Sequence, residues 1–317
     1  MVGSAKREPD SIDVAKSSYH QLSQNEIGGD NPCSRHLSGN TLPSDYGVNQ
    51  PMGKSFGKLT FPIRRTCENI LAIPMIALLN NERAPVTFGG GFIEIPFSEY
   101  CNALVSWWKR LEIDFETFSF EAGLKEATLR LEPLQNPQNR YLVTETRSRW
   151  TAVFSNSRGG SDVTSAVSHM CKVLSCHGVT IQCSPNLTKR EGNKTSIVSY
   201  AATSFTLDGP HETEWLNEIR HVSTRKDGGP WKFFQRGQVQ PFEKVEHYEN
   251  KHLRDRFTPE MLESYCEALG ILAFDATFYG PKSFLLHKLT KVPPTSPKMT
   301  FQEAQAKLYG RGQKSAS

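Results

Sequence analysis

The chain has 317 residues, of which 37% are hydrophobic, so it is long enough to bury a core without help from disulfides or a metal. Its seven cysteines are odd in number and irregularly spaced, which does not fit a secreted disulfide scaffold and favours reduced thiols in a cytoplasmic protein. Residues 1–30 contain no signal-like apolar stretch, and no apolar run reaches membrane-spanning length, so we expect no membrane segment.

The net charge of +4 gives little support for a nucleic-acid partner. It comes from residues 288–317, which carry six basic residues against one acidic residue, whereas residues 56–287 carry 26 of each. A nucleic-acid-binding protein concentrates its basic residues on the folded surface. We therefore expect an electroneutral folded body with a short basic tail.

Composition divides the chain into three parts. Residues 1–55 are rich in Ser, Asn, Gln, Gly and Asp without any period and are expected to be disordered. Residues 56–290 are expected to form one globular domain, with two subdomains joined near 135–140 as the alternative, since Pro and Asn cluster there. Residues 291–317 form a Pro-containing basic tail with one short amphipathic helix at 301–308.

Two amphipathic helices are expected in the middle of the chain. The first has Ser98 as its N-cap and places the apolar residues of segment 100–111, including two tryptophans, on one face. The second covers residues 162–176, with Ser161 or Asp162 as its N-cap and Gly178 as its end.

A third helix has the clearest ends. Thr258 is its expected N-cap, Pro259 occupies its first position and Gly270 terminates it. Segment 123–134 fits both a helix and a strand, and we assign it to a strand at 126–132.

Strands are predicted from short β-branched and aromatic runs. They are expected at residues 57–63, 86–95, 113–120, 126–132, 141–155, 179–184, 196–207, 271–278 and 283–289. The three glycines at 89–91 suggest a bulge or bend within the second of them. Because strands outnumber helices and follow one another along the chain, the pattern favours an α+β fold with a mixed, mainly antiparallel sheet and about three packed helices.

One loop has the composition of an anion-binding site. Arg158, Gly159, Gly160 and Ser161 lie between a predicted strand and a predicted helix, where free backbone N–H groups attract negative charge. The loop lacks the lysine and glycine spacing of a P-loop and the G-x-G-x-x-G pattern of a dinucleotide fold. An ordinary connecting loop is the alternative.

Cysteines and histidines gather in residues 169–183 without the spacing of a metal site. A structural zinc site uses C-x₂-C pairs, and none occurs here. Cys171 and Cys176, five apart on the predicted helix, are expected to point away from each other. We therefore predict no metal and no cofactor, and we interpret the thiols as small apolar groups.

Segment 247–256 is dense in groups that transfer protons. His252 and Asp255 would share one helical face, an arrangement in which a carboxylate orients an imidazole for catalysis. Mixed charges at this spacing also occur on any exposed helix. No nucleophile of defined spacing accompanies the pair.

A second cluster mixes cations with aromatic rings in segment 220–236, which suggests a surface for a macromolecule. The predicted interaction patch consists of Trp231, Lys232, Phe234, Arg236, His247, Arg254 and Arg256.

The sequence contains none of the motifs of serine hydrolases, zinc proteases or phosphoryl-transfer enzymes. The leading hypothesis is a non-enzymatic cytoplasmic protein that binds a protein partner in an inhibitor, immunity or adaptor-like role. One alternative is an enzyme that acts on an anionic small molecule or nucleotide, with the Gly159–Gly160 loop holding the anion and His252 with Asp255 moving the proton. The other is a single-stranded nucleic-acid-binding module.

Overall fold

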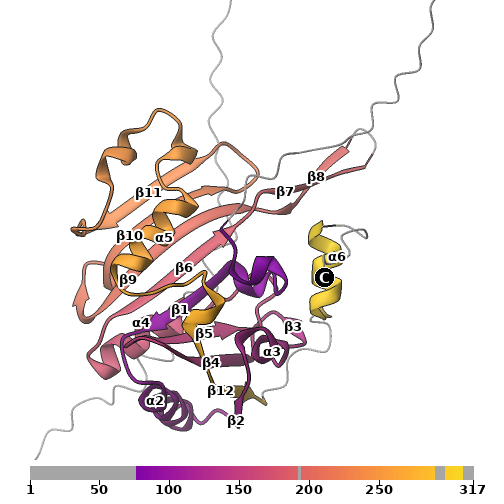
Figure 1. Cartoon of the computed structure of the whole chain (residues 1–317), viewed down its shortest axis with the longest axis vertical. Coiled ribbons are helices and arrows are strands. Elements are labelled where there is room, and N and C mark those ends of the chain that lie inside the picture. The colour runs from indigo at the N-terminus through magenta and orange to yellow at the C-terminus, as the bar shows by residue number, and fades with distance from the viewer. Residues whose placement is uncertain (1–75, 192–193, 290–296, 310–317) are drawn as a thin grey trace, which may run out of the picture. The chain divides into compact units, whose positions relative to one another are not determined.

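The computed structural model describes residues 76–191, 194–289 and 297–309, and it has an α+β fold (Figure 1). The strands are β1 Gly89–Ile93, β2 Phe115–Glu121, β3 Leu134–Gln135, β4 Arg140–Thr146, β5 Thr151–Ser155, β6 Gly178–Ser184, β7 Leu187–Glu191, β8 Lys194–Ser199, β9 Ala201–Thr213, β10 Leu216–Lys226, β11 Lys232–Gly237, β12 Tyr279–Lys288 and β13 Lys298–Met299. The α-helices are α2 Phe97–Arg110, α3 Leu124–Leu129, α4 Thr164–Leu174, α5 Pro259–Ala268 and α6 Phe301–Tyr309. Short 3₁₀ turns are η1 Leu78–Asn81, η2 Val86–Phe88, η3 Val245–Glu249, η4 Leu253–Asp255 and η5 Ala276–Phe278.

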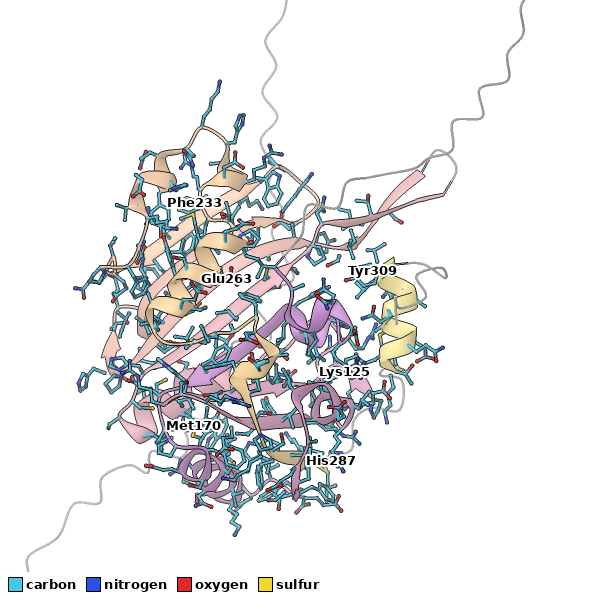
Figure 2. The ribbon with its side chains drawn as sticks, viewed as in Figure 1. Lys125, Met170, Phe233, Glu263, His287 and Tyr309 are labelled. Atoms are coloured by element: carbon cyan, nitrogen blue, oxygen red, sulfur yellow. The ribbon has the colours of Figure 1, made fainter. Side chains whose placement is uncertain are left out.

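Nine strands form one sheet in the order β11-β10-β9-β6-β1-β5-β4-β12-β2. Every neighbouring pair in this sheet is antiparallel, so the predicted mixed pairing is not observed there. Strand β1 lies between β5 and β6 and runs antiparallel to both, so β5 and β6 are parallel to each other. Helix α4 connects these two parallel strands and crosses over β1. Figure 2 places Phe233, on β11, and His287, on β12, toward opposite ends of the sheet.

Each face of the sheet carries its own apolar core because alternate residues of a strand point to opposite faces. On one face, Ile93, Val153 and Leu286 pack with residues of α2 and α4. On the other face, Phe92 and Phe205 pack with residues of α3, α5 and α6. Helix α5 lies across β9 on this second face (Figure 1).

The three glycines at 89–91 form a regular central strand and not the predicted bend. They pair in continuous register with β6 as part of β1. A Cβ atom on Gly91 would lie 2.6 Å from Val167 of α4, and a Cβ atom on Gly178 would lie 2.5 Å from the same side chain. Gly91 and Gly178 therefore let α4 approach the sheet closely.

The predicted ends of the third helix are confirmed. The Thr258 side chain accepts a hydrogen bond from the Met261 amide, Pro259 is the first residue of α5, and Gly270 has a φ of +78°. The first helix begins, and the second begins and ends, elsewhere than predicted. Helix α2 follows Pro96 without a side-chain cap, and α4 begins at Thr164 and ends at a left-handed Ser175.

The caps lead to a stability prediction. Replacing Thr258 by alanine is expected to lower the free energy of unfolding by about 1 kcal/mol, because the amide of Met261 loses its partner. Urea denaturation of both proteins measures this. Ser98→Ala is the control: Ser98 lies exposed inside α2, so its loss is expected to leave the urea midpoint unchanged, and equal effects of the two changes would contradict the cap assignment.

Two predicted strands are wrong. Segment 126–132 contains the end of α3, since Leu124, Ala127 and Leu131 are buried at helical spacing while Leu129 is exposed. Segment 271–278 contains turns and η5, since the Asp275 carboxylate accepts a hydrogen bond from the Thr277 amide at 2.8 Å.

Other predicted strands have different limits. Residues 141–155 form two strands, β4 and β5, separated by a turn, and residues 196–207 include the end of β8 and most of β9. The prediction missed β3, β7, β10, β11 and β13 altogether. The predicted strand at 57–63 and the predicted disordered region 1–55 lie outside the described residues.

The predicted C-terminal helix is present as α6. Its Phe301 and Ala304 are buried, and Gln305 donates hydrogen bonds to the carbonyls of Asn81 and Ala84. Among the helices within 76–191, 194–289 and 297–309, none combines the length and apolar character of a transmembrane segment.

Candidate functional site

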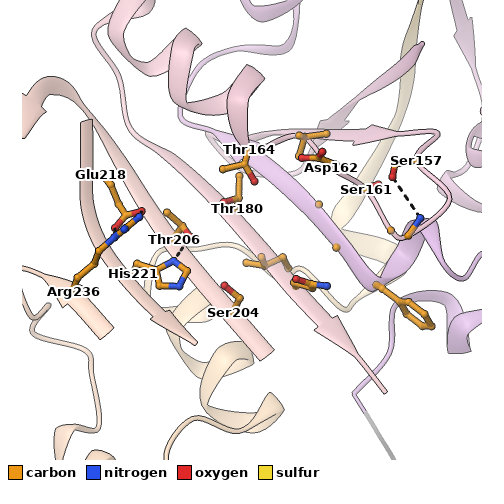
Figure 3. A pocket seen from close by; sticks show the side chains of 18 residues that line it. Ser157, Ser161, Asp162, Thr164, Thr180, Ser204, Thr206, Glu218, His221 and Arg236 are labelled. Atoms are coloured by element: carbon orange, nitrogen blue, oxygen red, sulfur yellow. Dashed lines mark hydrogen bonds and ion pairs between the residues drawn. The ribbon is translucent and has the colours of Figure 1, made fainter. Parts of the chain in front are cut away.

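A cavity of about 460 Å³ opens on the α4 face of the sheet, next to the first residues of α4 (Figure 3). Polar side chains from separate strands and from the loop before α4 meet there. The cavity is lined by Phe88, Gly89, Gly90, Ser157, Gly159, Gly160, Ser161, Asp162, Val163, Thr164, Thr180, Ile181, Gln182, Ser204, Thr206, Glu218, His221 and Arg236. Its volume is in the range of small-molecule sites.

One wall is the loop between β5 and α4, which side-chain hydrogen bonds hold in place. The Ser155 hydroxyl accepts from the Asp162 amide at 3.0 Å, and the Ser157 hydroxyl donates to the Asn136 side chain at 3.1 Å. Gly160 has a φ of +122°, a conformation that favours glycine. The sequence Ser-Arg-Gly-Gly-Ser therefore builds a fixed turn in front of α4.

The floor of the cavity centres on His221 of β10. Its Nδ1 lies 2.9 Å from the Thr206 hydroxyl and its Nε2 lies 3.0 Å from the Ser223 hydroxyl. Burial and the neighbouring arginines, acting against Glu218, together lower the pKa of His221 to about 4. The imidazole is therefore neutral at pH 7 and fixes the direction of two hydroxyls.

An ion pair closes one end of the cavity. The Arg236 guanidinium donates to both carboxylate oxygens of Glu218, at 2.5 and 2.7 Å, and this geometry fixes both side chains (Figure 3). The same guanidinium lies 4.8 Å from the ring centre of Trp215 and 5.6 Å from that of Phe234. Both rings remain nearly half exposed, at 44% and 48%.

A buried carboxyl group interacts with this ion pair. Asp208 of β9 is 2% exposed, and one of its oxygens has no hydrogen-bond partner among the described residues. Burial, with Glu218 nearby, raises the pKa of Asp208 to about 7, against the lowering effect of Ser168 and Arg236.

Three of the four residues of the predicted anion loop line the cavity. They are Gly159, Gly160 and Ser161. Arg158 does not line it, and its guanidinium donates to the carbonyl of Pro297. Binding of an anion by the loop stays a prediction.

The predicted His252 and Asp255 pair lies elsewhere. Neither residue lines the cavity, and they do not share a helical face, since His252 precedes the single turn η4. His252 is exposed, and Asp255 pairs with Arg254 at 3.2 Å. The residues that join the glycine loop are instead Glu218, His221 and Arg236.

The residues of the predicted interaction patch lie in several different environments. Arg236 and Phe234 belong to the cavity end, and Lys232 pairs with Asp227 at 3.0 Å. Arg256 lies 5.6 Å from the ring centre of Phe233, while His247 and Arg254 belong to η3 and η4. Trp231 is half-buried just before β11. A partner for this patch stays a prediction.

The sequence-based search missed the cavity floor because Thr206, Glu218, His221 and Arg236 lie on three strands, two of which it did not identify. A signal was present in the alternation of His221 and Ser223 with Val222, which is typical of a strand with one polar face. Within the described residues, no three His, Cys, Asp or Glu side chains form a possible metal site.

Comparison of the chain with protein-family models, curated proteins and solved structures finds no match.

Proposed function

We propose that the domain is a non-enzymatic binding module whose cavity takes a small, neutral, hydroxyl-rich ligand, such as a monosaccharide or the end of an oligosaccharide. The supporting observation is the convergence of hydroxyl side chains from the 157–163 loop, α4, β6 and β9 on one cavity. The predicted protein partner would fit this proposal if it carries such a saccharide group.

The chemistry of the lining favours a ligand with hydroxyl groups. Thr164 lies beside Thr180, with Ser204 and Thr206 on the neighbouring strand of the same cavity (Figure 3). The Ser161 hydroxyl also lines the cavity and bonds to the backbone of Ser155. A hydroxyl both donates and accepts, so a surface made of hydroxyls pairs best with a ligand that does the same. Thr180 is 7% exposed, which means that a ligand bonded to it would be largely removed from water.

The charges of the cavity do not favour an anion. Glu218 and Arg236 neutralise each other, and His221 is neutral at pH 7. Asp162 is the remaining charged side chain of the lining and is negative. A negatively charged ligand would meet no unpaired cationic side chain in the lining. A neutral polar ligand does not need one for its binding.

The rim of the cavity offers aromatic surface. Trp215 and Phe234 flank Arg236 and each exposes nearly half of its surface. The C–H face of a sugar ring is apolar and packs on an aromatic ring, while its hydroxyls point to the sides. An amphipathic ligand of this kind uses both the rim and the hydroxyl-lined floor.

The hydrogen bonds of His221 support binding over catalysis. Both ring nitrogens are engaged by hydroxyls of the protein, so the imidazole has no free position from which to move a proton of a ligand.

The test is titration of the full chain with glucose, galactose, mannose and N-acetylglucosamine by calorimetry, at low and high salt. We expect one of them to bind with an affinity that salt does not change. Thr180→Val is expected to weaken this binding about 3–10-fold, through loss of one hydrogen bond. Thr117→Val, an exposed change on β2 at the far sheet edge, is the matched control.

Two results would contradict the proposal. Binding of inorganic phosphate that weakens with salt, without saccharide binding, would support the anion site at Gly159 to Ser161 instead. Absence of binding by all four sugars, or equal effects of the Thr180 and Thr117 changes, would remove the cavity as a saccharide site.

A further inference from the structure

Helix α4 ends in a motif that brings two cysteines together. Ser175 adopts a left-handed conformation with φ +52° and ψ +46°, and the amide of Cys176 donates to the carbonyl of Cys171 at 3.1 Å. This hydrogen bond between residues five apart is typical of a Schellman motif, in which the side chains at these two positions commonly touch. In this chain both positions are cysteines.

The prediction that the two thiols point away from each other is wrong, because the helix stops before Cys176. The left-handed residue turns the chain back, so that the Cys176 thiol lies near enough to the Cys171 thiol for the two to influence each other's pKa. The Cys171 sulfur is also held from the other side, since a Cβ atom on Gly178 would lie 2.5 Å from it. Disulfides usually span about 4.4–6.8 Å between Cα atoms, a separation that this tight turn is suited to provide.

The two thiols differ in access to solvent. Cys176 is half-buried and Cys171 is buried. Interaction with the Cys171 thiol lowers the pKa of Cys176, against burial and the nearby carboxylates of Glu94 and Glu99. The negative end of the α4 dipole also acts against the thiolate. Burial raises the pKa of Cys101 and Cys183 to about 12, so these are poorer nucleophiles.

We propose that Cys171 and Cys176 are a dithiol site that small disulfides such as oxidised glutathione convert to an intramolecular disulfide. The Cys176 thiolate attacks one sulfur of glutathione disulfide and releases one glutathione thiolate, which takes up a proton. The Cys171 thiol then loses its proton and attacks the Cys176 sulfur, releasing the second glutathione. One disulfide is reduced to two thiols while two protein thiols become one disulfide.

This modification site is independent of the proposed saccharide site. The thiols lie at the C-terminal end of α4, whereas the cavity adjoins its first residues. The dithiol reaction needs no ligand in the cavity, so each proposal stands or fails without the other.

The experiment uses the full chain with Cys33→Ser and Cys67→Ser, which removes the two cysteines outside the described residues. The protein is treated with oxidised glutathione and digested with trypsin without a reductant. Because Lys172 separates the two cysteines, the disulfide joins peptide 159–172 to peptide 173–189. Mass spectrometry is expected to show this joined pair, with fragmentation distinguishing Cys176 from Cys183.

Two variants make the outcome decisive. Cys176→Ser is expected to abolish the reaction, and Cys171→Ala is expected to leave one glutathione bound at Cys176, since the resolving thiol is missing. Cys176 is half-buried in a turn, so its replacement by serine is compatible with folding. Stable glutathionylation with both cysteines present, no reaction at all, or reaction of Cys183 at the same rate would overturn the proposal.

Discussion

Replacing Glu243 by glutamine is expected to lower the free energy of unfolding by about 3–5 kcal/mol, because it leaves the buried Arg220 guanidinium without a counter-charge. Arg220 and Glu243 have side-chain exposures of 2% and 0%, and two hydrogen bonds of 2.8 and 2.7 Å join them. Glu243 also accepts from the Tyr248 hydroxyl at 2.7 Å. An arginine cannot lose its proton to escape this environment.

Urea denaturation at pH 7 measures the change. Asp227→Asn is the matched control, because Asp227 pairs with Lys232 at 3.0 Å on the surface, with side-chain exposures of 42% and 53%. Such an exposed pair contributes about 0–1 kcal/mol. Similar losses from both substitutions would show that burial of the Arg220 pair is not what makes it important.

This buried pair also helps to explain why the sequence did not predict strand β10. Hydrophobic alternation identifies a strand when its buried positions are apolar. In β10 the buried Val222 stands between Arg220 and Thr224, which are both about 1% exposed. From the sequence alone, Arg220 is interpreted as part of an exposed basic cluster. Its partner Glu243 follows β11 in the chain, so their pairing becomes visible only in the three-dimensional structure.

The sequence predicts local features well where the physical cause is local. The ends of α5 depend on Thr258, Pro259 and Gly270, which act on their own backbone, and they were predicted correctly. Segment 123–134 fitted two periodicities, and tertiary packing, which buries Leu124 and leaves Leu129 exposed, decided in favour of the helix. The α+β class follows from the number and order of strands even though several limits were wrong.

The candidate site was predicted only in part, because only one of its components is determined by local sequence. The loop Gly159 to Ser161 carries a recognisable turn composition, and it lines the cavity. His221 and Arg236 join it through the pairing of β10 with β11 and with β9, which is a non-local property. His252 and Asp255 had suitable chemistry and sequence spacing. However, η4 is a single short turn, and neither residue lines the cavity.

Replacing Asp208 by asparagine is expected to stabilise the protein at neutral pH. The pKa of Asp208 is raised from 3.8 to about 7, so at pH values between these the native state binds a proton that the unfolded chain has released. Stability from this group is therefore complete below pH 3.8 and is lost as the pH rises through 7. A shift of about three units corresponds to on the order of 4 kcal/mol. An asparagine amide that lacks a partner offsets part of this, which leaves an expected gain of about 1–3 kcal/mol at pH 8.

Urea denaturation of the wild type and of Asp208→Asn across pH 4 to 8 tests this directly. The difference between the two proteins is expected to be largest at pH 8 and to shrink toward pH 4, where Asp208 is protonated in the native state. His221 has the opposite slope, since its lowered pKa of about 4 makes stability fall on acidification, and it is present in both proteins. The comparison therefore isolates the carboxyl group. A variant that is less stable at pH 8, or a difference that does not vary with pH, would mean that Asp208 is ionised and stabilised in the native state, with the Arg236 guanidinium as the group that holds its charge.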